Sequence, residues 1–114
     1  VEGTRADLRA SLGDVSREGF ALEGFDDYFI ADRVADGNDM ARSIATVLDP
    51  ESGRRLEVAS NAPGFVFYTG DFAGRRGFCV EPLEYPDAPN RPEFPSAFVA
   101  PGTVRKLDIS WFVA

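Results

Sequence analysis

The sequence predicts an all-β protein, an antiparallel β-sandwich with little helix. Short runs rich in Val, Ile, Phe and Tyr recur along the chain, and such runs are typical of strands. Gly, Pro, Asn and Asp separate these runs, and such clusters are typical of turns. Only residues 4–12 have a helical pattern, since Leu8 and Leu12 lie four residues apart. Strands joined by turns therefore dominate the prediction.

The first predicted strands lie in the N-terminal half of the chain. Residues 24–30 begin as a turn and continue as a strand rich in aromatic residues. Residues 42–48 and 55–60 flank a turn that contains Pro and Gly, so they predict an antiparallel hairpin. In the second arm Leu56 and Val58 alternate with Arg, Glu and Ala. We therefore expect one face of the hairpin to be buried and the other exposed.

The remaining predicted strands are residues 65–69, 78–81 and 107–113. The last of these alternates apolar and mostly polar residues, which indicates a strand. Residues 82–101 contain six prolines, and each proline removes a backbone donor, so this segment predicts a packed crossing loop. We expect residues 1–114 to form a single domain.

The composition and the net charge exclude several classes of partner. The net charge is −7, whereas phosphate groups are bound by clustered Lys and Arg, so we expect neither nucleic acid nor an anionic membrane surface as a partner. The apolar stretches are only a few residues long, too short for a transmembrane helix. The hydrophobic share of 44% is that of a folded chain.

The cysteine and histidine content narrows the possible chemistry. Cys79 is the only cysteine, which excludes an internal disulfide and favours a cytoplasmic protein. Cys79 lies between Phe78 and Val80 and no histidine is present to activate it, so we expect a buried structural thiol. The acidic loop residues lack the spacing of a calcium loop, and no phosphate-binding glycine loop is present. We therefore expect no metal and no cofactor.

Glu81 is the strongest candidate for a catalytic residue. It ends a short apolar run and precedes the proline-rich loop, and a general base needs such a rigid position beside an ordered loop. We expect Glu81 to be partly buried beside Phe78 and Tyr85. The alternative is that Glu81 is a structural or solvated strand-end residue.

Four blocks of the sequence resemble the aldose 1-epimerase (galactose mutarotase) family, in the order that the family has. The first lies in residues 1–9. Residues 24–30, Gly-Phe-Asp-Asp-Tyr-Phe-Ile, are similar to the family's Gly-Tyr-Asp-His-Asn-Phe-Val. Residues 63–72, Pro-Gly-Phe-Val-Phe-Tyr-Thr-Gly-Asp-Phe, are similar to Pro-Gly-Val-Gln-Phe-Tyr-Thr-Gly-Asn-Phe. The fourth block is residues 77–96. The resemblance implies a partial sandwich of the galactose mutarotase-like type, about the last third of a family member.

The resemblance also implies a reaction. In the family a histidine protonates the ring oxygen of a free aldose such as glucose or galactose, while a glutamate takes the proton of the anomeric hydroxyl, so that the α and β anomers interconvert. Carried over, Glu81 is the general base and Asp26 is a substrate-binding residue. The family's histidine acid lies in an earlier region that has no counterpart here, and Val66 stands where the family has a sugar-binding glutamine.

Two alternatives remain beside the enzyme. One is a non-catalytic carbohydrate-binding β-sandwich module that lacks the general acid. The other is an assembly module, because part of a sandwich leaves unpaired strand edges and apolar faces. We therefore expect a homo-oligomer or a partner chain that supplies the missing strands. The aromatic residues Phe65 and Phe67 would suit a sugar-stacking platform, but their alternation favours a place in the core.

Overall fold

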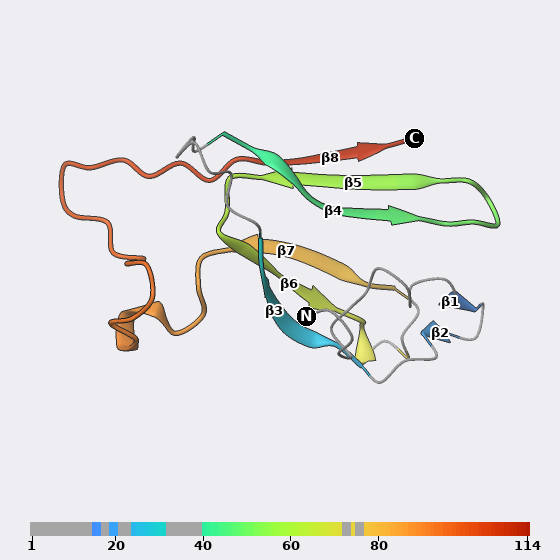
Figure 1. Cartoon of the computed structure of the whole chain (residues 1–114), viewed down its shortest axis with the longest axis horizontal. Coiled ribbons are helices and arrows are strands. Elements are labelled where there is room, and N and C mark those ends of the chain that lie inside the picture. The colour runs from blue at the N-terminus through green and yellow to red at the C-terminus, as the bar shows by residue number, and fades with distance from the viewer. Residues whose placement is uncertain (1–14, 17–18, 21–23, 32–39, 72–73, 75–76) are drawn as a thin grey trace.

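The computed structural model describes residues 15–16, 19–20, 24–31, 40–71, 74 and 77–114. Within these ranges the regular structure consists of strands and a short 3-10 helix, so the predicted all-β class is confirmed (Figure 1). The predicted helix at residues 4–12 lies outside the described residues. The elements are β1 (Val15–Ser16), β2 (Gly19–Phe20), β3 (Asp26–Ile30), β4 (Arg42–Leu48), β5 (Arg55–Ser60), β6 (Gly64–Tyr68), β7 (Cys79–Leu83), the 3-10 helix (Ala88–Asn90) and β8 (Ile109–Val113).

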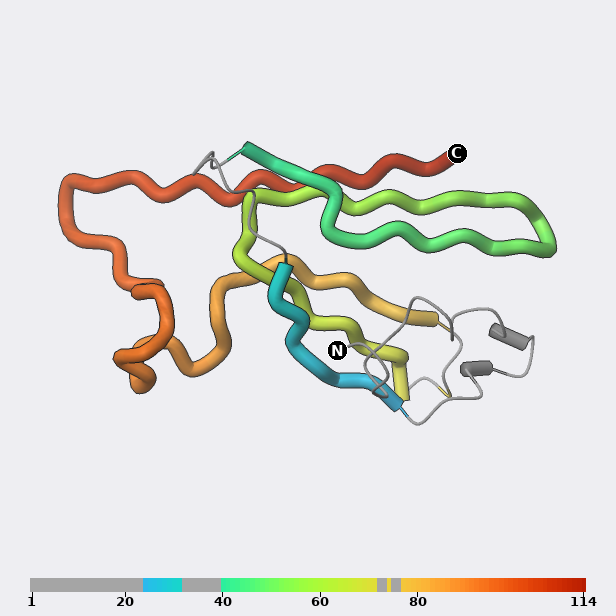
Figure 2. Tube along the Cα trace, viewed as in Figure 1, coloured from blue at the N-terminus to red at the C-terminus, as the bar shows by residue number. Residues whose placement is uncertain are grey.

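The strands form antiparallel sheets in which neighbours are often distant in sequence. One three-stranded sheet has the order β3-β6-β7 and another has the order β4-β5-β8, while β1 and β2 pair with each other. Figures 1 and 2 show the two larger sheets one above the other, with the β4–β5 hairpin reaching beyond the lower sheet. Every pairing among the strands that the structure describes is antiparallel, as the sequence predicts.

The β4–β5 hairpin has the predicted bounds and turn. The Asp49 N–H donates to the Arg54 carbonyl and the Gly53 N–H donates to the Asp49 carbonyl, each at 2.8 Å. Gly53 has a φ of 74°, a left-handed conformation that glycine adopts without strain. In β5 the Val58 side chain is fully buried whereas Arg55 is exposed. The predicted division is therefore confirmed at Val58 and Arg55 but is only partial, since Leu56, Glu57 and Ala59 are half-buried.

An aromatic cluster on β6 forms part of the core. Phe67 is 5% exposed, and its ring lies 5.8 Å from that of Phe25 and 5.9 Å from that of Phe78. Phe65 shares this face of β6 and stacks on Phe29 with ring centroids 5.6 Å apart. Phe67 therefore belongs to the core, as predicted from its alternation, whereas Phe65 lies on the same face but is only half-buried.

Buried Thr69 fixes the point at which β3 begins. The Phe25 N–H donates to Thr69 Oγ1 at 2.8 Å, and the Thr69 N–H donates to the Phe25 carbonyl at 3.0 Å. Thr69 is 1% exposed, and leaving its buried partner without an acceptor costs about 1–3 kcal/mol. This double contact locks Asp26, the next residue, beside the end of β6.

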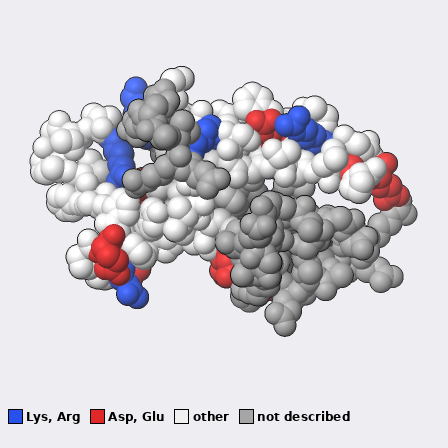
Figure 3. Space-filling view, in the orientation of Figure 1, with Lys and Arg blue, Asp and Glu red and all other residues white. Residues whose placement is uncertain are grey.

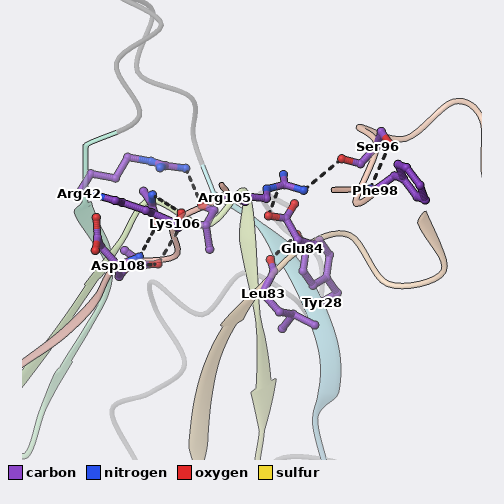
Figure 4. Close-up of polar contacts among 12 residues, drawn as sticks. Tyr28, Arg42, Leu83, Glu84, Ser96, Phe98, Arg105, Lys106 and Asp108 are labelled. Carbon is purple, nitrogen blue, oxygen red and sulfur yellow. Dashed lines mark hydrogen bonds and ion pairs between the residues drawn. The ribbon is translucent and has the colours of Figure 1, made fainter. Parts of the chain in front are cut away.

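The proline-rich segment crosses from β7 to β8 as the sequence predicts, but it is packed only in part, because residues 89–93 and 98–101 are exposed. Arg105 pairs with Glu84 at 2.9 Å and also donates to the Ser96 carbonyl at 3.2 Å, so it ties both arms of the loop together (Figure 4). The rings of Tyr85 and Phe94 lie 5.1 Å apart within the loop. These contacts join the start of the loop, next to β7, to residues further along the chain.

Strand β7 extends further than its sequence indicates. It continues through Pro82 to Leu83, two residues beyond the predicted end at Glu81. A proline is tolerated there because β7 is an edge strand among the described strands. In the part of the chain that the structure describes, no helix has the length and apolar character needed to cross a membrane.

Candidate functional site

The register of the β3-β6-β7 sheet brings the two predicted carboxylates onto one face. Asp26 and Glu81 stand in rows of cross-strand neighbours that are two residues apart along the strands. Side chains alternate between the faces of a sheet, so both rows project from the same side. We call this surface the site face. Its first row is Asp26, Tyr68 and Cys79, and its second row is Tyr28, Val66 and Glu81.

The two carboxylates are separated by a span that suits a small ligand. They lie on the outer strands with β6 between them, so their Cα atoms are about 12 Å apart for ideal strand spacing and rise. Both residues are exposed, so each carboxylate is open to solvent.

The exposure of the site face differs from the prediction at two positions. Glu81 is exposed, whereas we predicted partial burial beside Phe78 and Tyr85. Cys79 is exposed as well, so the predicted buried thiol is wrong. Both residues point outward from edge strand β7, on the face opposite the core residue Phe67. The apolar neighbours Phe78 and Val80 face the core side of the strand, which is why their presence misled the prediction.

Tyr28 is a residue of the site face that the sequence analysis missed. Its hydroxyl donates to the Leu83 carbonyl at 3.3 Å, and its ring lies 5.4 Å from that of Tyr85. Burial raises the pKa of Tyr28 to about 12, with further increases from Tyr85 and Glu84, so the phenol stays protonated at neutral pH. The signal was present in the sequence, because Tyr28 is two residues from Asp26 in one strand and therefore shares its face.

The other charged residues near the site face do not gather into a second cluster among the described residues. Asp27 lies on the core face, in a row with Phe67 and Val80. Among the described residues, no three His, Cys, Asp or Glu side chains gather closely enough to hold a metal ion. Figure 3 shows the described Lys and Arg side chains of the visible face scattered among acidic and neutral ones.

The chain is therefore an all-β protein in which two acidic residues lie on one face of an antiparallel sheet. A sequence model of the family described as Aldose 1-epimerase matches residues 2–111. The chain belongs to the aldose 1-epimerase family, as the four sequence blocks predict, and this family has a β-sandwich fold.

Several curated proteins are similar to the chain. Galactose mutarotase of Bos taurus is 39% identical over 117 residues, which cover 90% of this chain and 33% of that protein. Galactose mutarotase of Sus scrofa is 36% identical over 128 residues, covering 99% of this chain and 36% of that protein. Aldose 1-epimerase of Escherichia coli (strain K12) is 30% identical over 123 residues, covering 90% and 34%. The chain spans about a third of the length of the curated relatives it matches.

Proposed function

We propose that this chain acts in the interconversion of the α and β anomers of a free aldose, with Glu81 as general base and Asp26 as a substrate-binding residue. One observation supports this proposal above the others. Asp26 and Glu81 come from segments far apart in the sequence, and the register sets them on one face of one sheet. Membership of the aldose 1-epimerase family supplies the reaction class.

The proposed chemistry begins with the anomeric hydroxyl of the sugar. The Glu81 carboxylate takes the hydroxyl proton, and the electron pair released forms the C1 carbonyl as the bond from C1 to the ring oxygen breaks. The ring oxygen takes up a proton, which gives the open-chain aldehyde. Rotation about the bond between C1 and C2 and the reverse steps close the ring on the other face. The chain contains no histidine, so the proton for the ring oxygen comes from water or from a group outside this sequence.

Asp26 has a separate part in this proposal. Its exposed carboxylate accepts hydrogen bonds from hydroxyls of the sugar that do not react. The hydrogen bonds that join Thr69 to Phe25 fix the backbone beside Asp26, so the carboxylate is anchored at its base. Such anchoring holds the sugar with its anomeric carbon toward Glu81.

Cys79 provides a test of sugar binding at the site face. It is the only cysteine, it is exposed, and it stands in the same row as Asp26. Saturating D-galactose is expected to slow alkylation of Cys79 by iodoacetamide several-fold, measured by mass spectrometry. The polyol myo-inositol, which has no anomeric carbon, is the matched control. Equal alkylation rates in galactose and in inositol would contradict the proposed site, and Asp26→Ala is expected to abolish the protection.

Exposed apolar residues on β8 favour assembly as a second candidate function. Trp111, Phe112 and Val113 are 58%, 60% and 77% exposed, and consecutive residues of a strand cover both of its faces. An exposed apolar edge strand is a surface for pairing with another chain. We propose that the protein forms a homo-oligomer or pairs with a partner chain through β8. We also propose that it acts in the cytoplasm, where the Cys79 thiol stays reduced.

Light scattering coupled to size-exclusion chromatography tests the assembly. At tens of micromolar the isolated chain is expected to have a mass of at least two copies, and Phe112→Lys is expected to shift it toward the monomer. Thr46→Lys, a change at an exposed position of β4 on the other edge of the same sheet, is the control. A monodisperse monomer at every concentration would remove the homo-oligomer from the proposal.

A further inference from the structure

The second row of the site face has an apolar residue at its centre. Val66 stands at the middle of central strand β6, with Tyr28 on one side of its row and Glu81 on the other. Its isopropyl group neither donates nor accepts hydrogen bonds. A ligand that reaches both Asp26 and Glu81 therefore crosses β6 between Tyr68 and Val66, and it meets Val66 on the side nearer Glu81.

The Tyr28 ring borders this apolar area because Gly64 leaves room for it. A Cβ atom on Gly64 would lie 2.5 Å from Tyr28 Cζ, so the ring occupies the place that a side chain would take. From there the hydroxyl reaches the Leu83 carbonyl on β7 at 3.3 Å. The ring thus crosses the sheet from β3 to β7 beside the row of Val66. The hydrogen bond and the neighbouring Tyr85 ring hold it in place.

We propose that Val66 and Tyr28 form an apolar contact surface for one C–H face of the bound aldose, and that the site selects sugars with hydrogen or methyl where they meet Val66. This inference rests on the proposed function. A hydroxyl pressed against Val66 exchanges its hydrogen bonds with water for no partner, at a cost of several-fold in affinity or more. Hydrocarbon at that carbon gains from burial against Val66 and from contact with the aromatic ring. The ligand class is therefore an aldose with an extended apolar edge, such as a deoxy sugar.

A series of sugars that differ by one hydroxyl tests this selectivity. The dissociation constants of D-galactose and of its 2-deoxy, 3-deoxy, 4-deoxy and 6-deoxy forms are measured from their protection of Cys79 against alkylation. At least one deoxy form is expected to bind the chain as tightly as galactose or more tightly. The position of the missing hydroxyl identifies the carbon that faces Val66.

Two variants separate the contact surface from general effects on the fold. Val66→Thr keeps the shape of the side chain but replaces one methyl group with a hydroxyl. It is expected to shift the ratio of the dissociation constants of galactose and of the best-bound deoxy form roughly tenfold in favour of galactose. Val104→Thr makes the same change at a position that is 86% exposed, and it is expected to leave the ratio unchanged. Tyr28→Ile removes the aromatic ring and is expected to raise the dissociation constant of every sugar roughly tenfold.

The possible results decide the matter. Tighter binding of galactose than of every deoxy form, or an unchanged ratio in Val66→Thr, would overturn the inference while leaving the proposed function standing. Unchanged affinities in Tyr28→Ile would overturn it as well. If no sugar protects Cys79, the proposed site itself fails, and that failure is recognised because the alkylation rate is the same in every sugar and in buffer.

Discussion

Replacing Glu81 with glutamine is expected to remove nearly all of the chain's acceleration of galactose mutarotation, by about 100-fold or more. Glutamine keeps the size of the side chain but cannot take a proton from the anomeric hydroxyl. The measurement is polarimetry of freshly dissolved α-D-galactose, with the rate in buffer subtracted. The chain's own rate is expected to be low, because it has no histidine to protonate the ring oxygen.

Glu93→Gln is the matched control for this loss. Glu93 lies in the proline-rich loop, where its exposed carboxylate pairs with exposed Arg91 at 3.7 Å, and exposed pairs of this kind contribute little. The control is expected to keep the rate of the parent chain. An unchanged rate in Glu81→Gln would show that Glu81 is not the base. Equal losses of rate in Glu81→Gln and Glu93→Gln would show that the effect comes from removing any negative charge, and not from removing the base.

Local patterns in the sequence were sufficient to predict most of the strands. The β4–β5 hairpin follows from alternation and from a turn with a glycine at positive φ, because all of its determinants lie within 19 consecutive residues, 42 to 60. The end of β7 did not follow from local pattern. From local sequence alone, Pro82 predicts the end of a strand, because proline has no backbone N–H to donate. The order of the strands shows that β7 is an edge strand, where the missing donor is tolerated.

The residues of the candidate site were easier to predict than their arrangement on one face of the sheet. Asp26 and Glu81 were both named from the sequence, but their common face depends on register across β6, which alternation within one strand does not contain. The exposure of Cys79 has the same origin. Its apolar neighbours in sequence lie on the opposite face of β7, and tertiary packing decides which face is covered. The spacing from Asp26 places Tyr28 on the same face, but its contact with distant Leu83 depends on the tertiary structure.

Truncating Phe67 to alanine is expected to lower the free energy of unfolding by about 3–5 kcal/mol. Phe67 is 5% exposed and sits between the rings of Phe25 and Phe78, so its loss removes buried contacts and leaves a cavity. Domains of this size have about 5–15 kcal/mol in total, so the change takes a large share. Urea unfolding followed by circular dichroism measures the loss, and Phe67→Leu extends the series with a smaller one if the alanine variant does not fold.

Phe98→Ala is the control, because Phe98 is 79% exposed in the crossing loop, and a substitution there is expected to change stability by about 0.5 kcal/mol or less. Phe67 lies between Val66 and Tyr68 on β6 but faces the core, whereas its two neighbours belong to the site face. In the folded fraction of Phe67→Leu, galactose is therefore expected to protect Cys79 as it does in the parent chain. Equal unfolding midpoints for Phe67→Ala and Phe98→Ala would mean that the core does not lie on the Phe67 face of the sheet. The assignment of the site face as the face that binds the ligand would then be wrong as well.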